Sequence, residues 1–297
     1  VAMSDYILSC SSTVDLTPQQ MKERDIRYVC FHFILDGQDH KDDMGQSIAP
    51  EELYSRMVAG AEAKTSQVAL GEYTEYFEQL LQEGKDILHV EFSSGLSGSY
   101  NSARLVVEDL KEKYPDRKIY LVDSLAASSG YGLIMETLAD MRDAGKSVEE
   151  LYQWIEENRL RMHHWFFSTD LTFYIRGGRI SKTAGAVGTL LGICPLLNMD
   201  NLGRLQPREK IRTKKKVIRR IVEMMEAHAQ DGTEYSGKCY ICQSACLDDA
   251  KAVAALVEEK FPNLQGKVEI YPIGATIGSH TGPGTVALFF WGDERKD

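Results

Sequence analysis

Short apolar runs alternate with longer amphipathic segments through the first half of the chain. The runs DYILSC (5–10), DILHVEF (86–92) and KIYLVDS (118–124) have the length and composition of buried strands. Between such runs, segments like YNSARLVVEDLKEKY (100–114) repeat their apolar residues at helical spacing. The repeated order of strand, loop and helix predicts parallel strands connected by crossover helices.

Further elements in this half follow from start and stop signals. A Thr-Pro pair precedes a helix expected over 19–23, and Pro50 opens an amphipathic helix in APEELYSRMVAG. RYVCFHFIL is expected to form one strand. A turn at Asp36 and Gly37 then joins this strand to the polar segment QDHKDD, which runs back beside it. Two more helices are expected over residues 73–83 and 131–143.

The pattern changes after about residue 160. An aromatic run, HHWFFSTD, leads into a glycine-rich segment over 175–192, and LLNMDNLGRLQP (196–207) then has the pattern of a hairpin. The remaining expected elements are helices over 215–229 and 247–260 and strands over 238–243, 267–273 and 285–291. The sequence therefore predicts two α/β domains, residues 1–162 with a mainly parallel sheet and residues 163–297.

Composition narrows the class of protein. The chain has 297 residues, of which 43% are hydrophobic, and its formal net charge is −10. This acidic balance argues against general affinity for nucleic acid or for an anionic membrane surface. No run approaches the ~18–20 apolar residues of a membrane helix, and the start of the chain lacks the layout of a signal peptide. We therefore expect a cytoplasmic protein with no integral membrane segment.

Six cysteines occur, and three lie close together as Cys239, Cys242 and Cys246. A zinc site would need a second pair of ligands at matching spacing, and none follows. The surrounding GKCYICQSA has the pattern of a strand, in which residues three apart point to opposite faces. Buried reduced thiols are therefore favoured over metal binding, and no metal site is expected.

The segment SSGLSGS (93–99) concentrates hydroxyl groups and glycines between an expected strand and an expected helix. That position argues against a flexible linker, because ligands of open α/β sheets bind at such loops. Serine hydroxyls and the free N–H groups of the first helical turn attract an anion such as a carboxylate or a phosphate. A serine N-cap with a loop glycine is an equally good interpretation of this segment alone.

A serine nucleophile is a further interpretation of the same loop. The hydrolase elbow G-x-S-x-G is incomplete, because residues 95–99 read GLSGS. The order Ser97, then Asp123 or Asp170, then His280 still matches the order of an α/β-hydrolase triad. A serine esterase or thioesterase that uses Ser97 and His280 is therefore the alternative to ligand binding.

Three other segments carry candidate binding groups. GSHTGPG (278–284) is expected to be a tight turn between strands that presents His280 as a polar site residue. IRGGRIS places Arg176 and Arg179 around two glycines, which suits an oxyanion site or a helix C-cap with solvated arginines. The stretch 201–220 has nine Lys and Arg residues against one acid, which indicates either a docking patch or a solvated helix face. No P-loop or dinucleotide fingerprint occurs, so no cofactor is expected.

The ordered set of motifs along almost the whole chain resembles the DegV family of bacterial fatty-acid-binding proteins. That family includes the acyl-carrier subunits of the bacterial fatty-acid kinase. The matching motifs are SSTVDL (11–16), TSQ (65–67), SSGLSGSYNSA (93–103), VDSLAASSGYG (122–132), LTFYIRGGRIS (171–181), GTLLGICPLL (188–197), REKIRTKKK (208–216) and IGSHTGPG (277–284). Each motif alone is a weak signal, whereas the ordered set is specific.

The resemblance implies a lipid-binding carrier with no catalytic residues of its own. A long-chain fatty acid such as palmitate, stearate or oleate would fill a buried apolar tunnel at the domain junction, and a partner fatty-acid kinase would convert its carboxylate to an acyl phosphate. Thr65, Ser97 and His280 are the positions implied to hold the carboxylate. Arg176 and Arg179 are implied to face the kinase and its phosphate. The supporting loop residues are Ser66, Ser94, Gly95, Gly98 and Thr281.

Three positions depart from the usual pattern of the family. Ser11 stands where the first motif commonly begins with Asp, Val68 stands where Pro usually follows TSQ, and Cys194 stands where Lys often precedes the PLL segment. The implied carboxylate trio is intact. The tunnel walls must be apolar, because burial of each methylene contributes ~0.8 kcal/mol. The candidate wall residues are Phe33, Ile34, Leu190, Leu191 and Ile193.

Overall fold

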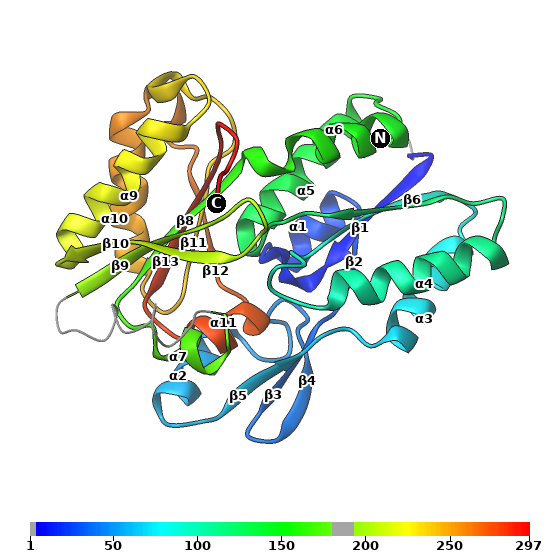
Figure 1. Cartoon of the computed structure of the whole chain (residues 1–297), viewed down its shortest axis with the longest axis horizontal. Coiled ribbons are helices and arrows are strands. Elements are labelled where there is room, and N and C mark those ends of the chain that lie inside the picture. The colour runs from blue at the N-terminus through cyan, green and yellow to red at the C-terminus, as the bar shows by residue number, and fades with distance from the viewer. Residues whose placement is uncertain (1–3, 180–192) are drawn as a thin grey trace.

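The computed structural model describes residues 4–179 and 193–297, and this part of the chain forms three β-sheets with helices packed around them (Figure 1). Among the described helices, none has the length and apolar character needed to cross a membrane. The mixed α/β fold with a parallel N-terminal sheet confirms the predicted fold class.

The N-terminal sheet is parallel throughout, as the alternation of strands and helices predicts. Its strands, in spatial order, are β2 (Ile26–Val29), β1 (Tyr6–Ser11), β6 (Asp86–Glu91) and β7 (Ile119–Asp123). Every residue of β1 is buried, because helices cover both faces of the sheet (Figure 1). The packed helices are α1 (Pro18–Glu23), α3 (Leu70–Leu81), α4 (Ser99–Lys113), α5 (Ser128–Asp143) and α6 (Val148–Asn158).

A small antiparallel sheet stands beside the parallel one. Its strands, in spatial order, are β4 (Gln38–Lys41), β3 (His32–Leu35) and β5 (Ala63–Ser66). The predicted turn is confirmed, since Asp36 and Gly37 both have positive φ angles, of 49° and 80°. The single strand expected over 27–35 is wrong: the chain breaks at Cys30 and Phe31, so β2 joins the parallel sheet and β3 joins this one. The pairing of β3 with β5 depends on tertiary contacts that a local pattern does not contain.

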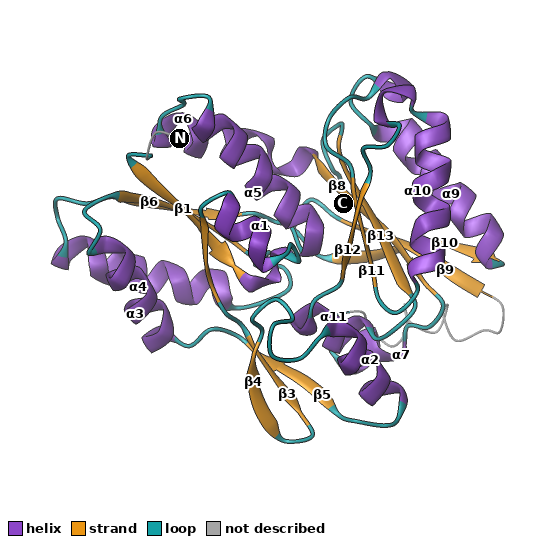
Figure 2. Ribbon diagram, turned by 180° about the vertical axis from the view of Figure 1, so that it is seen from behind, coloured by secondary structure: helices purple, strands orange, loops and turns teal. Residues whose placement is uncertain are grey.

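The third sheet has six strands and is mostly antiparallel. Its strands, in spatial order, are β10 (Leu205–Arg212), β9 (Ile193–Met199), β8 (Met162–Ser168), β13 (Thr285–Trp291), β11 (Tyr240–Gln243) and β12 (Glu269–Pro272). The antiparallel pairing of β9 with β10 confirms the predicted hairpin. Helices α9 (Lys214–His228) and α10 (Leu247–Lys260) pack together beside this sheet (Figure 2).

Helix α5 lies between the two larger sheets and contacts both. It packs on β1 of the parallel sheet and on β8, β11 and β13 of the third sheet. Gly130 permits this approach, because a Cβ atom there would lie 2.5 Å from His164 Nε2 and 2.6 Å from the Phe289 ring. The largest apolar cluster consequently includes both Leu8 and Phe289. The division into domains at residue 162 stays a prediction.

The segment GSHTGPG is not the tight turn between strands that we expected. Residues Ala275–Thr281 form helix α11, which ends at Gly282 with a φ of +66°. The glycine that suggested a turn, Gly278, instead allows close packing, since a Cβ atom there would lie 2.3 Å from the Tyr54 hydroxyl. Tyr54 belongs to α2 (Pro50–Val58), and α11 also contacts the short helix α7 (Thr172–Arg176).

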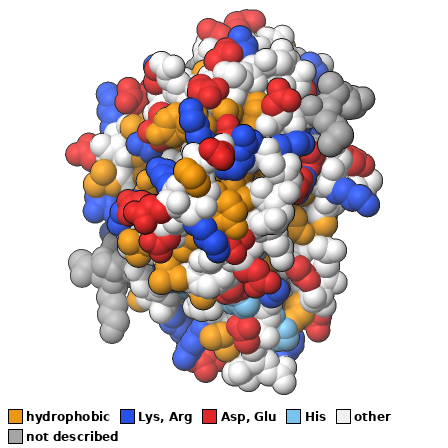
Figure 3. All heavy atoms as spheres, turned by 90° about the vertical axis from the view of Figure 1, so that its right-hand side faces the viewer, with side chains coloured by type: hydrophobic (Ala, Val, Ile, Leu, Met, Phe, Trp, Pro, Cys, Tyr) orange, Lys and Arg blue, Asp and Glu red, His pale blue; other side chains and the backbone are white. Residues whose placement is uncertain are grey.

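The surface of the parallel-sheet side carries charges of both signs. Figure 3 shows basic and acidic side chains interspersed over the end of the molecule that includes α3 and α4. Some of them pair across helices, as in the 2.6 Å contact of Lys113 Nζ with Glu78 Oε1. On the face in view, no continuous basic surface of the kind that nucleic acid requires is present.

Candidate functional site

A cavity of about 310 Å³ lies where α11 and the loops after β5 and β6 meet the third sheet. The cavity is lined by residues from both sides of position 162, and it therefore lies at the predicted junction between the two domains. Its polar groups include Thr65, Ser97, Arg179 and His280. Its apolar walls include Phe31, Phe92, Phe166, Met199, Ala287 and Phe289. A site with apolar walls and a few convergent polar groups is typical of a small-molecule pocket.

Three of the five expected wall residues do not line this cavity. Phe33 packs against α2 in a separate apolar cluster, and neither Ile34 nor Ile193 is part of the lining. The expectation was wrong for Phe33 and Ile34 because β3 belongs to the small sheet, whose buried side chains pack against α2. The other two candidates, Leu190 and Leu191, lie outside the described residues.

The three residues implied to hold a carboxylate all line the cavity. Thr65 comes from β5 and His280 from α11, and Thr65 Oγ1 lies 2.6 Å from His280 Nε2. Ser97 comes from the loop before α4, where its Oγ accepts a hydrogen bond from the Ser99 N–H at 3.1 Å. The same Oγ donates to Ser99 Oγ at 3.1 Å. The fold thus gathers hydroxyl and imidazole groups from three distant segments.

The five supporting residues divide into two groups. Ser66, Gly98 and Thr281 line the cavity. Ser94 and Gly95 do not, and they hold the loop in place instead, since the Ser94 N–H donates to Asp123 Oδ1 at 3.1 Å. A Cβ atom at Gly95 would lie 2.5 Å from the carbonyl oxygen of residue 203, so the loop can pack there only with glycine.

The two arginines of IRGGRIS have different surroundings. Arg176 is exposed at the end of α7, where its guanidinium lies 5.5 Å from the centre of the Phe173 ring. Arg179 lines the cavity, and its Nη1 is 3.4 Å from His280 Nδ1. Gly177 caps α7, as one interpretation of this segment predicted, and a Cβ atom there would lie 2.2 Å from His280 Nδ1. Of these two arginines, Arg179 is therefore the one that adds a positive charge to the cavity.

The electrostatics around His280 favour an anionic ligand held by neutral and cationic donors. Burial, with a further contribution from Arg179, lowers the pKa of His280 to about 4. Burial also lowers the pKa of Arg179 from its usual value. At neutral pH the imidazole is therefore uncharged, while the guanidinium retains its proton.

The described residues do not assemble the hydrolase triad. Ser97 Oγ is hydrogen-bonded to Ser99, and His280 Nε2 lies against Thr65. The Asp123 carboxylate accepts from backbone N–H groups, and Asp170 accepts from Thr172. No acidic residue occurs in the segment 180–192 either. The geometry gives a serine hydrolase neither an activated nucleophile nor an orienting carboxylate.

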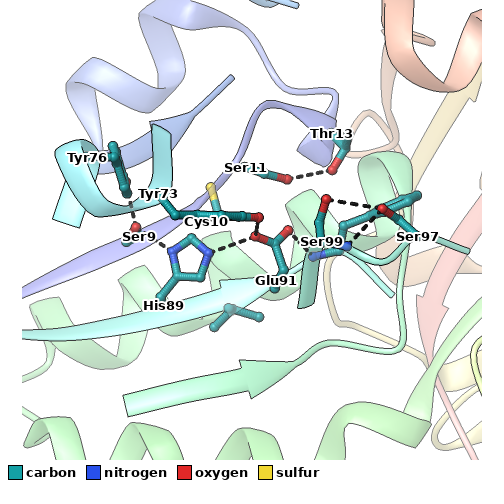
Figure 4. Close-up of polar contacts among 12 residues, drawn as sticks. Ser9, Cys10, Ser11, Thr13, Tyr73, Tyr76, His89, Glu91, Ser97 and Ser99 are labelled. Atoms are coloured by element: carbon teal, nitrogen blue, oxygen red, sulfur yellow. Dashed lines mark hydrogen bonds and ion pairs between the residues drawn. The ribbon is translucent and has the colours of Figure 1, made fainter. Parts of the chain in front are cut away.

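A buried polar network beneath the loop escaped the sequence analysis (Figure 4). Glu91 is fully buried at the end of β6, and it accepts hydrogen bonds from the Tyr73 hydroxyl and from the Phe92 N–H at 2.7 Å. His89 Nε2 lies 3.0 Å from the same carboxylate. Tyr73 also contacts Ser99, the partner of Ser97, so the network reaches the cavity. Two polar residues at spacing i, i+2 in an otherwise apolar strand were the available signal.

The three residues that depart from the family pattern make contacts outside the cavity lining. Ser11 Oγ bonds Thr13 Oγ1 at 2.7 Å, and the Ser11 N–H donates to the Tyr131 hydroxyl at 2.9 Å. Cys194 is buried in β9, and Val68 is buried in the N-terminal core. None of the three departing residues lines the cavity.

The cavity lining also contains polar groups that the sequence did not single out. Ser128 donates to Asp15 Oδ2 at 2.5 Å, and its Oγ lies 3.4 Å from Cys242 Sγ. Burial and the neighbouring Asp42 raise the pKa of Asp15 well above its usual value. His164 accepts from the Ala127 N–H at 3.1 Å, so it takes part in packing rather than in metal binding.

The basic stretch is partly neutralised by local contacts. Arg220 Nε and Nη1 lie 2.9 Å from Glu209 and Glu223, and Lys214 Nζ lies 3.1 Å from Asp249. Several other cations of this stretch are exposed. Both the docking patch and the solvated helix face remain compatible with these contacts.

Comparison with known proteins identifies the family. The model of the DegV family, described as an uncharacterised protein family, matches residues 10–293. The chain is 36% identical over 294 residues to the DegV domain-containing protein CPE0026 of Clostridium perfringens, covering 99% of this chain and 100% of that one. It is 34% identical over 294 residues to the DegV domain-containing protein YteA of Lactococcus lactis, covering 96% of each.

Solved structures agree with this assignment. A DegV family protein from Thermus thermophilus with fatty-acid binding superimposes with a TM-score of 0.85 at 27% identity, over 98% of this chain and 100% of that one. A DegV lipid-binding protein from Thermotoga maritima gives a TM-score of 0.81 at 26% identity, over 98% and 100%. The order of motifs, the fold and these matches together show that the chain belongs to the DegV family.

Proposed function

We propose that this protein is a non-catalytic carrier of a long-chain fatty acid such as palmitate, stearate or oleate. The observation that carries the proposal is one cavity that combines apolar walls with a cluster of hydroxyl, imidazole and guanidinium groups. The similar DegV proteins from Thermus thermophilus and Thermotoga maritima, which bind a fatty acid and a lipid, support it. A volume of about 310 Å³ is in the range of small-molecule pockets.

In this proposal the acyl chain lies along the apolar walls and the carboxylate lies against Thr65, Ser97 and His280. Burial of a sixteen-carbon chain supplies the driving force, at ~0.8 kcal/mol for each methylene. The carboxylate leaves water, so it needs several donors in place. The hydroxyls of Thr65 and Ser97 supply two, the neutral His280 imidazole supplies another, and Arg179 balances the charge.

The finer part of the proposal is that a separate fatty-acid kinase, in the cytoplasm, phosphorylates the bound carboxylate. Arg176 is exposed on α7 next to the polar end of the cavity, and the basic residues 208–216 supply further positive charge. Reversal of charge at Lys215 and Lys216 should abolish acyl-phosphate formation by the kinase while fatty-acid affinity is retained. Unchanged acyl-phosphate formation in that variant would remove the basic run from the docking surface.

The experiment for fatty-acid binding uses two serines of one loop. Delipidated protein is titrated with palmitate by isothermal calorimetry, and the Ser97→Ala variant is compared with Ser94→Ala. Ser94 is exposed and does not line the cavity, so it is the matched control. Loss of one charge-assisted hydrogen bond should weaken binding about tenfold in Ser97→Ala only. Delipidated protein that binds neither palmitate nor oleate would refute the function, and equal loss in both variants would refute the role of Ser97.

A further inference from the structure

A second cluster of candidate ligands lies on the opposite face of β8 from the cavity. His163 and His164 are neighbours in this strand, so their side chains point to opposite faces of the sheet. His164 lines the cavity, whereas His163 meets His228 at the end of α9 and Asp293 after β13. One ligand atom from each of the last three residues lies within 4.8 Å of the others.

We propose that His163, His228 and Asp293 form a binding site for a divalent first-row transition-metal ion, with Zn²⁺ as the simplest occupant. Neutral imidazole and carboxylate are ligands that such ions accept, and a set of two histidines and one carboxylate leaves a coordination position for water. The expectation of no metal site came from the cysteines, and these three residues, 65 and 130 positions apart, form no sequence motif.

The distances within the cluster suit a tetrahedral ion. Asp293 Oδ1 lies 2.9 Å from His163 Nε2 and 3.1 Å from His228 Nδ1. Two ligand atoms that are each about 2.1 Å from a tetrahedral zinc ion stand about 3.4 Å apart. An ion at this position would replace the hydrogen bond that His163 Nε2 donates to the Asp293 carbonyl oxygen at 2.7 Å, and the carboxylate would move outward by about half an ångström.

The three ligands are held in position by their surroundings. The His163 ring is parallel to Phe290, with centroids 5.2 Å apart, and it stacks on His228 at 5.1 Å. The Asp293 N–H donates to the His228 carbonyl at 3.0 Å. Gly292 is needed for this contact, because a Cβ atom there would lie 2.2 Å from the same carbonyl oxygen. Such preorganisation lowers the entropic cost of coordination.

The cluster is open to an ion from solution. The side chains of Asp293 and His228 are 59% and 35% exposed, whereas that of His163 is 5% exposed. Arg295 is a neighbouring cation, and it is turned toward backbone carbonyls, including that of Met162 at 3.0 Å. A bound ion would tie β8, α9 and the segment after β13 together, and would therefore stabilise the folded chain.

The test uses the full chain without an affinity tag, dialysed against a chelator and then titrated with Zn²⁺ alone. His228→Ala and Asp293→Asn are the two ligand variants, and both should fold because these side chains are 35% and 59% exposed. His32→Ala is the matched control, because His32 also contacts two carboxylates, Asp39 at 3.0 Å and Glu72 at 2.7 Å. Calorimetry gives stoichiometry and affinity, and thermal unfolding gives the stabilisation by zinc.

We expect the parent and the His32→Ala control to bind one equivalent of Zn²⁺ and to show a zinc-dependent rise in Tm. Each ligand variant should bind at least tenfold more weakly and lose that rise. Binding of one equivalent with undiminished affinity in His228→Ala and in Asp293→Asn would overturn the proposal. So would parent protein that binds no zinc, or zinc binding that only His32→Ala removes.

Discussion

Replacement of Ala287 with leucine tests whether the cavity holds an acyl chain. Ala287 lies in β13 between Phe166 of β8 and Cys242 of β11, and all three residues line the cavity. Ala287 belongs to the apolar wall of the cavity, and we place the far end of the acyl chain against it. The leucine side chain adds three carbon atoms, which displace about three methylene groups of a long acyl chain. At ~0.8 kcal/mol each, the loss is about 2.4 kcal/mol, or roughly 60-fold in the dissociation constant for palmitate.

The assay compares two chain lengths in delipidated protein. Displacement of a fluorescent fatty acid is measured with palmitate and with octanoate, whose shorter chain should not reach Ala287. Palmitate should lose most of its affinity in Ala287→Leu, while octanoate should lose little. Ala59→Leu is the control for the added apolar atoms, because Ala59 is exposed outside the cavity. Unchanged palmitate affinity in the folded variant, or an equal loss for both acids, would refute the placement of the chain.

Three other predictions concern the polar groups. His280 has a pKa of about 4 in the folded protein against 6.5 as its ordinary value, so the unfolded chain binds the proton first. The free energy of unfolding of ligand-free protein should therefore fall as the pH drops from about 7 to about 4.5. In urea titrations of His280→Gln, this fall should be smaller by roughly 2 kcal/mol. Equal pH dependence in the two proteins would contradict the lowered pKa of His280. Tyr73→Phe should lower the free energy of unfolding by about 2 kcal/mol, because Tyr73 donates a hydrogen bond to the buried Glu91 carboxylate. Tyr76→Phe should lower it by about half as much, because Tyr76 is hydrogen-bonded to a serine hydroxyl. Equal losses of stability in chemical denaturation would refute this difference. A fluorophosphonate probe should leave Ser97 unlabelled, as mass spectrometry will show, and a covalent adduct at Ser97 would restore the esterase interpretation.

Much of the first half of the chain could be predicted from local patterns. The helices expected over 73–83 and 131–143 correspond to α3 and α5, and the strands of the parallel sheet match their apolar runs within a few residues. Periodic burial is a property of ten or so consecutive residues, so the sequence contains it directly. The motif of glycines and hydroxyls after β6 was likewise recognisable, because ligand loops follow strands in this class of fold.

The errors share one physical cause. RYVCFHFIL is apolar enough to be one strand, yet two different sheets take its halves. GSHTGPG has the composition of a turn, yet its first residues continue α11, because Gly278 packs against Tyr54. In both places the local preference is weak, and packing against a distant segment determines the structure.

The sequence by itself determined the class of fold, most of the strands and helices, and the segments that supply the polar groups. Only the tertiary structure decided which of those groups meet. It brings Thr65 to His280 across 215 positions, turns Arg179 into the cavity while Arg176 stays exposed, and places Glu91 beneath the loop of Ser97. Hydrogen bonds within an element depend on neighbours a few residues apart, whereas a binding site depends on contacts that exist only after the whole chain has closed and packed.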